Sequence, residues 1–366
     1  MRCAIVHYWL LKMRGGEKVV EALCRLLPEA DVFTLFYDPA GVSETIRARR
    51  VTVSGLNPLR RYYRGLLPLM PMALESFDLR GYDLVVSSES GPAKGVMVPA
   101  GARHICYCHS PMRYLWELYP DYLHDWTPSK WKRGLMAPVA SGLRVWDHAT
   151  AARVDAFVAN SENVRRRIRR AYGRDSEVVY PPVAVEQFYH EAAEDYFLVV
   201  SELVAYKRTA DAVRCFARTG RKLKIVGEGP EYARLKNMAG PGVEFCGTVT
   251  AEELRRLYAR CRALVMPQEE DFGMSAVEAQ ASGKPVVALG RGGVLESVPG
   301  EDPCGGVFYS EAGEAGLERA LVEFERIEGG IEPRRLQERA ARFSESRFAE
   351  RMREILGVGA TGGVSA

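Results

Sequence analysis

Short apolar segments alternate with stretches of helical periodicity along the chain, and this alternation limits the fold more than any other feature of the sequence. In the first half, Glu17 to Leu27 carries apolar residues at helical spacing and is stopped by Pro28. Polar, Gly or Pro residues bound the apolar runs of this half, which cover residues 3–7, 31–36, 83–88, 104–108 and 155–161. Runs of this kind are typical of buried parallel strands.

The second half repeats the pattern more clearly. Strands are predicted over residues 197–201, 222–227, 243–247, 263–267 and 285–289. Helical stretches lie between them, around residues 209–218, 231–238, 251–260 and 274–282. This order of elements indicates a parallel sheet that is covered by helices on both faces.

A chain of 366 residues is too long for one ordinary domain and about right for two. The sequence therefore predicts an α/β protein with two Rossmann-like, doubly wound domains over residues 1–181 and 182–344. We place the join near Tyr180–Pro181–Pro182, because the double proline ends a strand and stiffens the connection. A helix over 345–357 can pack back onto the first domain, and the Gly-rich tail 358–366 is expected to be disordered.

The composition fits a soluble, cytoplasmic protein. Apolar residues make up 47% and charged residues 27% of the chain, which excludes disordered, collagen-like and disulfide-stapled classes. The eight cysteines show neither a CxxC pair nor zinc-ligand spacing, so reduced thiols are expected. The chain has no apolar run long enough to span a bilayer, and its start lacks the long apolar stretch of a signal peptide.

The small net charge of +3 hides an asymmetry between the two halves. Residues 1–180 hold 26 Lys and Arg against 18 Asp and Glu, a balance of +8, and the remainder holds 24 against 29, a balance of −5. A basic half indicates a polyanionic partner or an anionic membrane face. The run Arg165–Arg170 fits the solvated face of a helix equally well, and no nucleic-acid-binding module is present.

The most informative stretch is Glu269–Pro285, which follows a predicted strand directly and starts a helix. Glu270 lies in the loop before this helix, and Glu278 lies about one turn inside it. Free N–H groups are expected at the helix start, at Phe272, Gly273 and Met274. Two carboxylates on either side of exposed amides suit a sugar nucleotide. By spacing alone, a capped helix with two surface glutamates is the more common explanation.

The string Glu-x-Phe-Gly-x-x-x-x-Glu, followed by Ala-x-Ala-x-Gly-x-Pro-Val-Val, resembles the signature of the family 4 retaining glycosyltransferases, which have the GT-B fold. Supporting segments occur in the family's order, over 201–208, 225–235, 243–254 and 292–298. The resemblance covers nearly the whole chain. The opening HYWLLKMRGGEKVVEAL and the block CYCHSPMRYLW are similar to the WbaZ-like mannosyltransferases of bacterial surface polysaccharide assembly.

The resemblance implies that the two domains face each other across a cleft, with the donor bound by the second domain and the acceptor by the first. It assigns catalytic roles to His109, Lys207 and Glu270, with Lys207 neutralising the donor diphosphate and Glu270 contacting the donor sugar. Glu278 would bind the ribose hydroxyls. Further donor contacts are implied at Gly15, Gly16, Arg208, Thr248, Val249, Phe272, Gly273, Met274 and Ser275. Gly15 and Gly16 are expected to form the loop after the first strand.

One position departs from the family's pattern. The family usually has an Arg five residues before the Lys at position 207, and here that residue is Glu202. This puts a two-cation diphosphate clamp in doubt. Enzymes of this type are similar in using front-face displacement, in which the leaving diphosphate deprotonates the acceptor hydroxyl. They need no metal, and this sequence has no Asp-x-Asp motif, so no metal and no cofactor are expected.

The function expected from the resemblance is transfer of mannose from GDP-mannose to a polyprenyl-diphosphate-linked glycan, in O-antigen or exopolysaccharide synthesis. Peripheral contact with an anionic membrane is expected at residues 58–74 and 126–136, which interleave basic, aromatic and apolar residues. Ordinary helices of the domain core would explain these segments equally well. Alternative functions are transfer from a UDP-sugar, a sugar-nucleotide epimerase or hydrolase, and a non-catalytic nucleotide-sugar-binding subunit.

Overall fold

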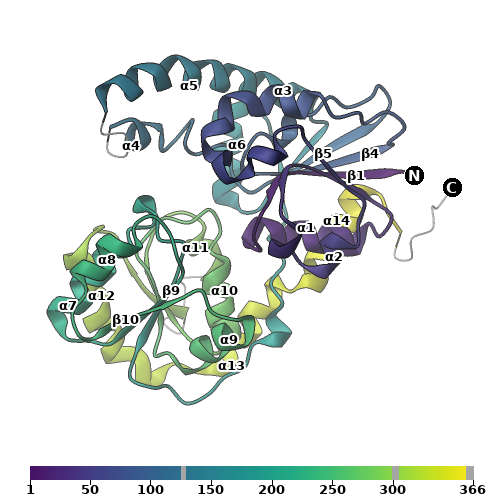
Figure 1. Ribbon diagram of the computed structural model, residues 1–366. Coiled ribbons are helices and arrows are strands. Elements are labelled where there is room, and N and C mark those ends of the chain that lie inside the picture. Colours follow the sequence, from purple (N-terminus) through teal and green to yellow (C-terminus); the bar gives the residue numbers. More distant parts are fainter. Residues whose placement is uncertain (125–128, 299–304, 360–366) are drawn as a thin grey trace. The chain divides into compact units, whose positions relative to one another are not determined.

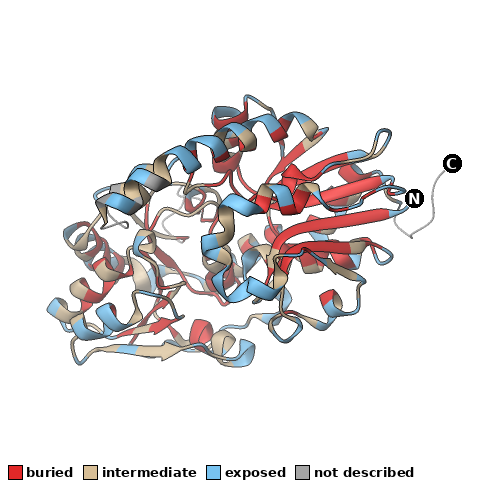
Figure 2. Ribbon diagram, turned by 45° about the horizontal axis from the view of Figure 1, so that its top comes forward, coloured by how far each residue is buried: buried red, intermediate tan, exposed pale blue. Residues whose placement is uncertain are grey.

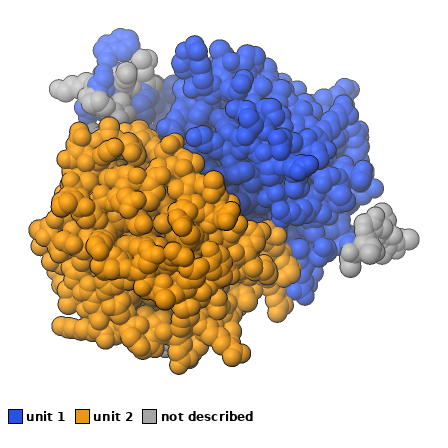
Figure 3. All heavy atoms as spheres, turned by 60° about the horizontal axis from the view of Figure 1, so that its bottom comes forward, with its two compact units in different colours: residues 1–182, 348–366 blue, residues 183–347 orange. Residues whose placement is uncertain are grey.

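The computed structural model describes residues 1–124, 129–298 and 305–359 (Figure 1). It divides into two compact units, one formed by residues 1–182 with 348–366 and the other by residues 183–347 (Figure 3). The first and the last of the described residues therefore belong to the same unit.

The first unit is built on a parallel sheet in the order β3-β2-β1-β4-β5-β6-β7. Its strands are β1 (Cys3–Leu10), β2 (Asp31–Tyr37), β3 (Val51–Val53), β4 (Leu84–Glu89), β5 (Arg103–Cys108), β6 (Ala156–Ala159) and β7 (Glu177–Val178). Its helices are α1 (Gly15–Leu26), α2 (Glu44–Arg47), α3 (Met70–Glu75), α4 (Tyr119–His124), α5 (Lys130–Thr150), α6 (Glu162–Tyr172) and most of α14 (Glu345–Leu356).

The second unit contains a parallel sheet in the order β10-β9-β8-β11-β12-β13. Its strands are β8 (Phe197–Val200), β9 (Leu223–Val226), β10 (Val243–Gly247), β11 (Leu264–Met266), β12 (Val286–Leu289) and β13 (Gly306–Tyr309). Its helices are α7 (Thr209–Thr219), α8 (Tyr232–Met238), α9 (Ala251–Arg260), α10 (Met274–Ala281), α11 (Val294–Ser297), α12 (Glu314–Ile327) and α13 (Pro333–Ala340).

Both sheets are covered on both faces. Successive side chains of a strand point to opposite faces, and in β1 the side chain of Ile5 enters one core cluster while those of Ala4 and Val6 enter another. In β8, Val199 and Leu198 are divided between two clusters in the same way. Figure 2 shows the buried strands inside helices with exposed outer faces. The predicted fold class is confirmed: each unit is a Rossmann-like, doubly wound α/β structure.

Helix α14 completes the core of the first unit, although it lies at the far end of the chain. Phe348 and Met352 are buried in the same cluster as Leu23 of α1. The Phe348 ring lies 5.7 Å from that of Tyr107 in β5, measured between centroids. Burying an apolar side chain of this size contributes about 1.5–3 kcal/mol, so α14 is an integral part of this unit.

Candidate functional site

The carboxyl edge of the second sheet brings Lys207 and Glu270 together. Lys207 ends a short 3-10 turn, Ala205–Lys207, in the connection after β8, and Glu270 lies between β11 and α10. Nζ of Lys207 donates to Oε1 of Glu270 over 2.5 Å, and both side chains are largely shielded, at 16% and 17% exposed. Nε2 of Gln268 donates to the same oxygen over 2.7 Å. The sequence predicted Lys207 and Glu270 but gave no signal for Gln268.

The charge of Lys207 is fixed by this arrangement. Burial lowers the pKa of the amine, but the Glu270 carboxylate beside it raises the pKa by more, so the net shift is upward. Lys207 therefore stays protonated at any physiological pH. A pre-oriented cation of this kind can stabilise negative charge that develops on a leaving phosphate.

Helix α10 begins beside this pair. Gly273 is its N-cap residue with φ of 94°, a left-handed conformation that glycine adopts without strain. A Cβ atom at this position would lie 3.3 Å from Oγ of Ser297 and 3.4 Å from Cε of Met266. The first turn of a helix leaves backbone N–H groups without intrahelical partners, and here that turn contains Met274 and Ser275. The backbone can thus approach an anion or hydroxyl closely.

Phe272 and Glu278 hold this helix start in place from inside the unit. The Phe272 side chain is buried and packs against Phe343, so only its backbone is available to a ligand. Glu278 is 5% exposed, and its Oε2 accepts a hydrogen bond from the Tyr258 hydroxyl over 2.9 Å. Burying a carboxylate is costly unless it is hydrogen-bonded. The explanation of Glu270 and Glu278 as two surface glutamates is therefore wrong.

Three further residues predicted to contact the donor also follow the carboxyl ends of strands in the second sheet, and they differ in exposure and in their partners. Arg208 has φ of 52° at the start of α7, and its guanidinium pairs with Asp211 over 2.8 Å. Thr248 is exposed and Val249 half-buried, directly after β10. Glu202 is half-buried in the connection after β8, five residues before Lys207.

In the first unit, His109 follows β5 and joins a chain of hydrogen-bonded side chains. Nε2 of His109 lies 2.8 Å from Oγ of Ser88, at the end of β4. Nδ1 of the fully buried His7 lies 3.1 Å from both the carbonyl oxygen and Oγ of Ser88. A carbonyl oxygen only accepts, so this contact requires the proton of His7 to be on Nδ1. The Ser88 hydroxyl is then free to donate to Nε2 of His109.

The other nitrogen of His7 faces helix α1. Nε2 of His7 is buried, has no hydrogen-bond partner in the described ranges, and lies 4.0 Å from Oε1 of Glu17. Oε2 of Glu17 accepts from the backbone N–H of Arg14 over 3.1 Å, as the Glu of a helix capping box does. The chain His109–Ser88–His7 thus ends beside the carboxylate that caps α1. The sequence singled out His109 but did not predict Ser88, which only its place at a strand end could have indicated.

Gly15 and Gly16 require a correction. They were expected in the loop after β1, but the Arg14–Glu17 capping box starts α1 at Gly15, so both glycines form its first turn. A Cβ atom on Gly16 would lie 3.1 Å from Oη of Tyr8 and 3.6 Å from Nε2 of His109. The glycine keeps α1 close to this histidine cluster.

Two kinds of feature are absent from the described residues. In the ranges 1–124, 129–298 and 305–359, no three His, Cys, Asp or Glu side chains are grouped so that they could hold a metal ion. None of the helices described there has both the length and the apolar content needed to cross a membrane. The predicted membrane segment 126–136 begins at residues 126–128, which lie outside the described residues, as do residues 360–366 of the predicted disordered tail.

Two family models match the chain, one for each unit. The model described as Glycosyltransferase Family 4 matches residues 13–187, and that described as Glycosyl transferases group 1 matches residues 194–324. An uncharacterized glycosyltransferase of Methanocaldococcus jannaschii is 27% identical over 149 residues, which cover 39% of this chain and 42% of that protein. The aligned region thus spans less than half the length of this curated relative.

Solved structures match over almost the full chain. HepE of Anabaena, in complex with UDP-glucose, gives a TM-score of 0.71 at 17% identity and covers 98% of this chain and 100% of its own. The lipopolysaccharide outer core galactosyltransferase WaaB gives a TM-score of 0.66 at 15% identity and covers 98% and 99%. These likenesses establish the GT-B fold. The two family models, one for each unit, both describe glycosyltransferases.

Proposed function

We propose that this protein is a retaining, metal-independent glycosyltransferase that moves mannose from GDP-mannose onto a lipid-linked glycan of a bacterial surface polysaccharide. The observation that carries the proposal is the Lys207–Glu270 pair, set beside the N-terminus of α10 in the unit that matches the group 1 model. A fixed cation and helix amides suit a diphosphate, and two shielded carboxylates suit sugar and ribose hydroxyls.

Each residue takes a defined part in the proposed reaction. Lys207 and the backbone N–H groups of Met274 and Ser275 stabilise the diphosphate as the bond to the sugar breaks. Glu270 orients the donor sugar, and Glu278 orients the ribose. The leaving diphosphate takes the proton of the acceptor hydroxyl, so the protein contributes positioning and electrostatic stabilisation and no general base. His109, in the first unit, keeps the catalytic role that the resemblance implies for it.

The preference for mannose and GDP rests on the likeness of residues 7–23 and 106–116 to the WbaZ-like mannosyltransferases. The polysaccharide role draws support from the same likeness and from WaaB, which acts on the lipopolysaccharide outer core. One observation favours a second candidate: HepE was solved with UDP-glucose, so transfer from a UDP-sugar is the alternative donor use.

Calorimetry with GDP-mannose, GDP, UDP-glucose and UDP tests the donor. We expect the guanosine ligands to bind best, and we expect Glu278→Gln to weaken them by about tenfold through the loss of one charged hydrogen bond. Tyr258→Phe is the matched control, because it removes the hydroxyl that donates to Glu278 and leaves the carboxylate in place. Tighter binding of the uridine ligands would show that the donor is a UDP-sugar and not GDP-mannose. If none of the four ligands binds, the assignment of these residues to a donor site is wrong.

An assay with a lipid-linked acceptor separates the enzyme from its alternatives. Product formation with retained anomeric configuration, unchanged by EDTA, is the expected result. Loss of turnover with EDTA would contradict the metal-independent mechanism. Consumption of the donor without any acceptor would indicate an epimerase or hydrolase, and binding without turnover would indicate a non-catalytic subunit.

A further inference from the structure

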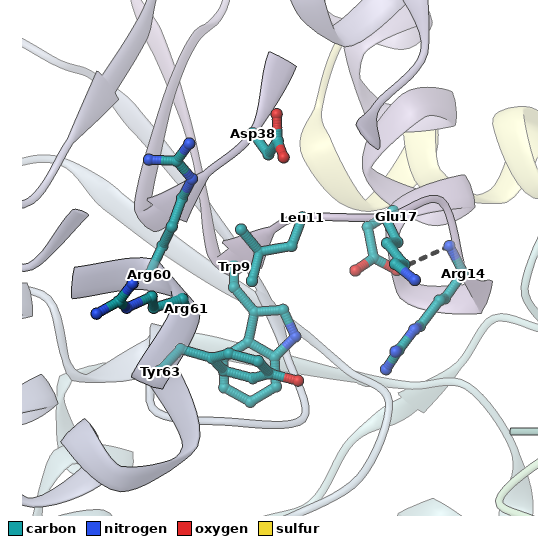
Figure 4. A pocket seen from close by; sticks show the side chains of 9 residues that line it. Trp9, Leu11, Arg14, Glu17, Asp38, Arg60, Arg61 and Tyr63 are labelled. Carbon is teal, nitrogen blue, oxygen red and sulfur yellow. Dashed lines mark hydrogen bonds between the residues drawn. The ribbon is translucent and has the colours of Figure 1, made fainter. Parts of the chain in front are cut away.

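The first unit contains a pocket of about 300 Å³ that the donor-site argument does not use (Figure 4). Its wall is formed by Trp9 in β1, by the segment that follows β1, by Asp38 directly after β2, and by the 3-10 segment Asn57–Leu69. The pocket therefore lies at the carboxyl ends of two neighbouring parallel strands, which is where open α/β sheets bind their ligands.

Aromatic rings form one wall of this pocket. The rings of Trp9 and Tyr63 lie 5.0 Å apart between centroids, at 61° to each other. Figure 4 shows them between Arg14 on one side and Arg60 and Arg61 on the other. Both residues are half-buried, so each ring presents a partly exposed surface to the pocket. Such rings offer an apolar surface of the kind that lines small-molecule sites.

The charge of the pocket is positive. Four basic residues line it, namely Lys12, Arg14, Arg60 and Arg61, against Glu17 and Asp38. Both carboxylates have partners in the fold. Glu17 accepts from the backbone N–H of Arg14, and Asp38 accepts from that of Ala40 over 3.1 Å.

Three of the four cations are not neutralised by the protein. In the described part of the chain, none of Lys12, Arg60 and Arg61 forms an ion pair, and all three are exposed. Some exposed arginines elsewhere are neutralised by carboxylates: Arg218 pairs with Glu318, and Arg256 pairs with Glu253. Three like charges around one pocket repel one another unless an anion is present, so the pocket is suited to an anion that carries more than one negative charge.

Apolar side chains are exposed next to the pocket on the same segment. Leu59 is 47% and Tyr62 56% exposed, directly before and after Arg60 and Arg61. Met72, just beyond the 3-10 segment, is 66% exposed. Basic and apolar side chains side by side suit a ligand that has both a charged group and a hydrocarbon chain.

We propose that this pocket binds the phosphate or diphosphate group of the lipid-linked acceptor. Lys12, Arg60 and Arg61 neutralise the anion, the Trp9 and Tyr63 rings pack against the sugar attached to it, and Leu59 and Tyr62 contact the lipid. The inference rests on the proposed function, because it gives the acceptor of that reaction a binding site in the unit that does not hold the donor.

Direct binding to the 366-residue chain tests the proposal, with farnesyl diphosphate in neutral detergent micelles as the probe. Farnesol in the same micelles tests the need for the anion, and inorganic pyrophosphate tests the need for the lipid. The variant is the double substitution Arg60→Gln/Arg61→Gln. Its matched control is Arg169→Gln/Arg170→Gln, which removes the same charge from two exposed residues of α6 in the same unit.

We expect farnesyl diphosphate to bind more tightly than pyrophosphate and farnesol not to bind. The pocket variant should weaken farnesyl diphosphate binding by about tenfold or more, the control should not, and nucleotide affinity should be unchanged in both. Equal losses in the two variants would overturn the site, because the effect would then come from net charge alone. Equal affinity for pyrophosphate and farnesyl diphosphate would overturn the lipid-linked occupant.

The transfer assay separates failure of this proposal from failure of the proposed function. If the protein transfers sugar while the pocket variant keeps its KM for the acceptor, the pocket assignment is wrong and the enzyme stands. If the pocket binds farnesyl diphosphate as expected but no nucleotide sugar is turned over with any acceptor, the enzymatic function is wrong and the anion site stands.

Discussion

Nζ of Lys207 and Oε1 of Glu270 lie 2.5 Å apart, although the two residues are 63 positions apart in the chain. Each group limits what the other can do. The carboxylate keeps the amine protonated, and the amine holds the carboxylate at the start of α10. The pair therefore provides a cation and a hydrogen-bond acceptor whose positions are fixed before a ligand arrives, which is the arrangement that stabilises a developing charge at least cost.

Replacing Lys207 should remove the largest electrostatic contribution to the proposed reaction. We expect Lys207→Met to lower kcat/KM for the donor by about 10²–10³-fold, as loss of one stabilising donor does in other enzymes. Steady-state kinetics with GDP-mannose measures this. Lys222→Met is the matched control, since Lys222 belongs to the same unit and its exposed amine pairs with Asp195 over 3.2 Å. Equal effects of the two substitutions would exclude a diphosphate contact at Lys207.

The Ser88 hydroxyl should position His109. Ser88→Ala removes the group that links Nε2 of His109 to Nδ1 of His7, so we expect kcat to fall by about tenfold while nucleotide affinity stays constant. Its neighbour provides a close control, because Oγ of Ser87 makes a similar bond, 2.8 Å to Nε2 of the core residue His104. Ser87→Ala should leave kcat per folded molecule unchanged. A change of the pH profile in Ser88→Ala alone would distinguish positioning from a loss of stability.

Gly273 should be required both for its conformation and for close approach of the ligand. Gly273→Ala places a side chain at φ of 94° and within 3.3 Å of the Ser297 hydroxyl, so we expect a loss of about 1–2 kcal/mol in unfolding free energy and weaker donor binding. Gly220→Ala is the matched control. It places a side chain at a positive φ of 71°, but the new Cβ atom would meet nothing within 4 Å, so this variant tests the backbone strain without a steric contact. Equal donor affinity in the two variants would exclude close approach at Gly273.

Much of the fold could be predicted from the sequence, because both sheets are parallel and buried on both faces. Their central strands appear as continuous apolar runs. The strands that the pattern missed, β3 and β13, both lie at sheet edges. An edge strand has one neighbour and is only partly buried, as in β3, so it carries no clear apolar run.

The candidate site was predictable where the sequence carries a local motif, and not where it depends on pairing across the fold. Glu270, Gly273 and Glu278 lie within one motif around a helix start. Ser88 and Tyr258 belong to the candidate site because of their hydrogen bonds to residues that are distant in the chain. Ser88 bonds with His109, and Tyr258 bonds with Glu278. A hydrogen bond between residues on different elements leaves no periodicity in a sequence, so the sequence did not reveal either pairing.

His104 should make stability depend on pH. The imidazole is buried, with Nδ1 at 3.0 Å from the carbonyl oxygen of Arg153 and Nε2 at 2.8 Å from Oγ of Ser87. Burial lowers its pKa to about 4, whereas an unfolded chain protonates histidine near pH of about 6.5. Between these two values the unfolded state binds more protons than the folded state, so stability is full above the upper value and is lost as the pH falls toward the lower one.

Chemical denaturation at neutral pH and at about pH 5 measures this contribution. Because the unfolded chain is protonated at His104 in the more acidic condition, we expect the free energy of unfolding to be about 2 kcal/mol lower there than at neutral pH. His104→Gln keeps a hydrogen-bonding side chain but cannot titrate. All other titrating groups are common to both proteins, so subtracting the pH-dependent change in unfolding free energy of the variant from that of the wild type leaves the contribution of His104. The wild type should lose more stability than the variant on acidification. Equal losses of stability in the wild type and in the variant would contradict the prediction. They would show that His104 has the same protonation state in the folded and the unfolded chain at both pH values.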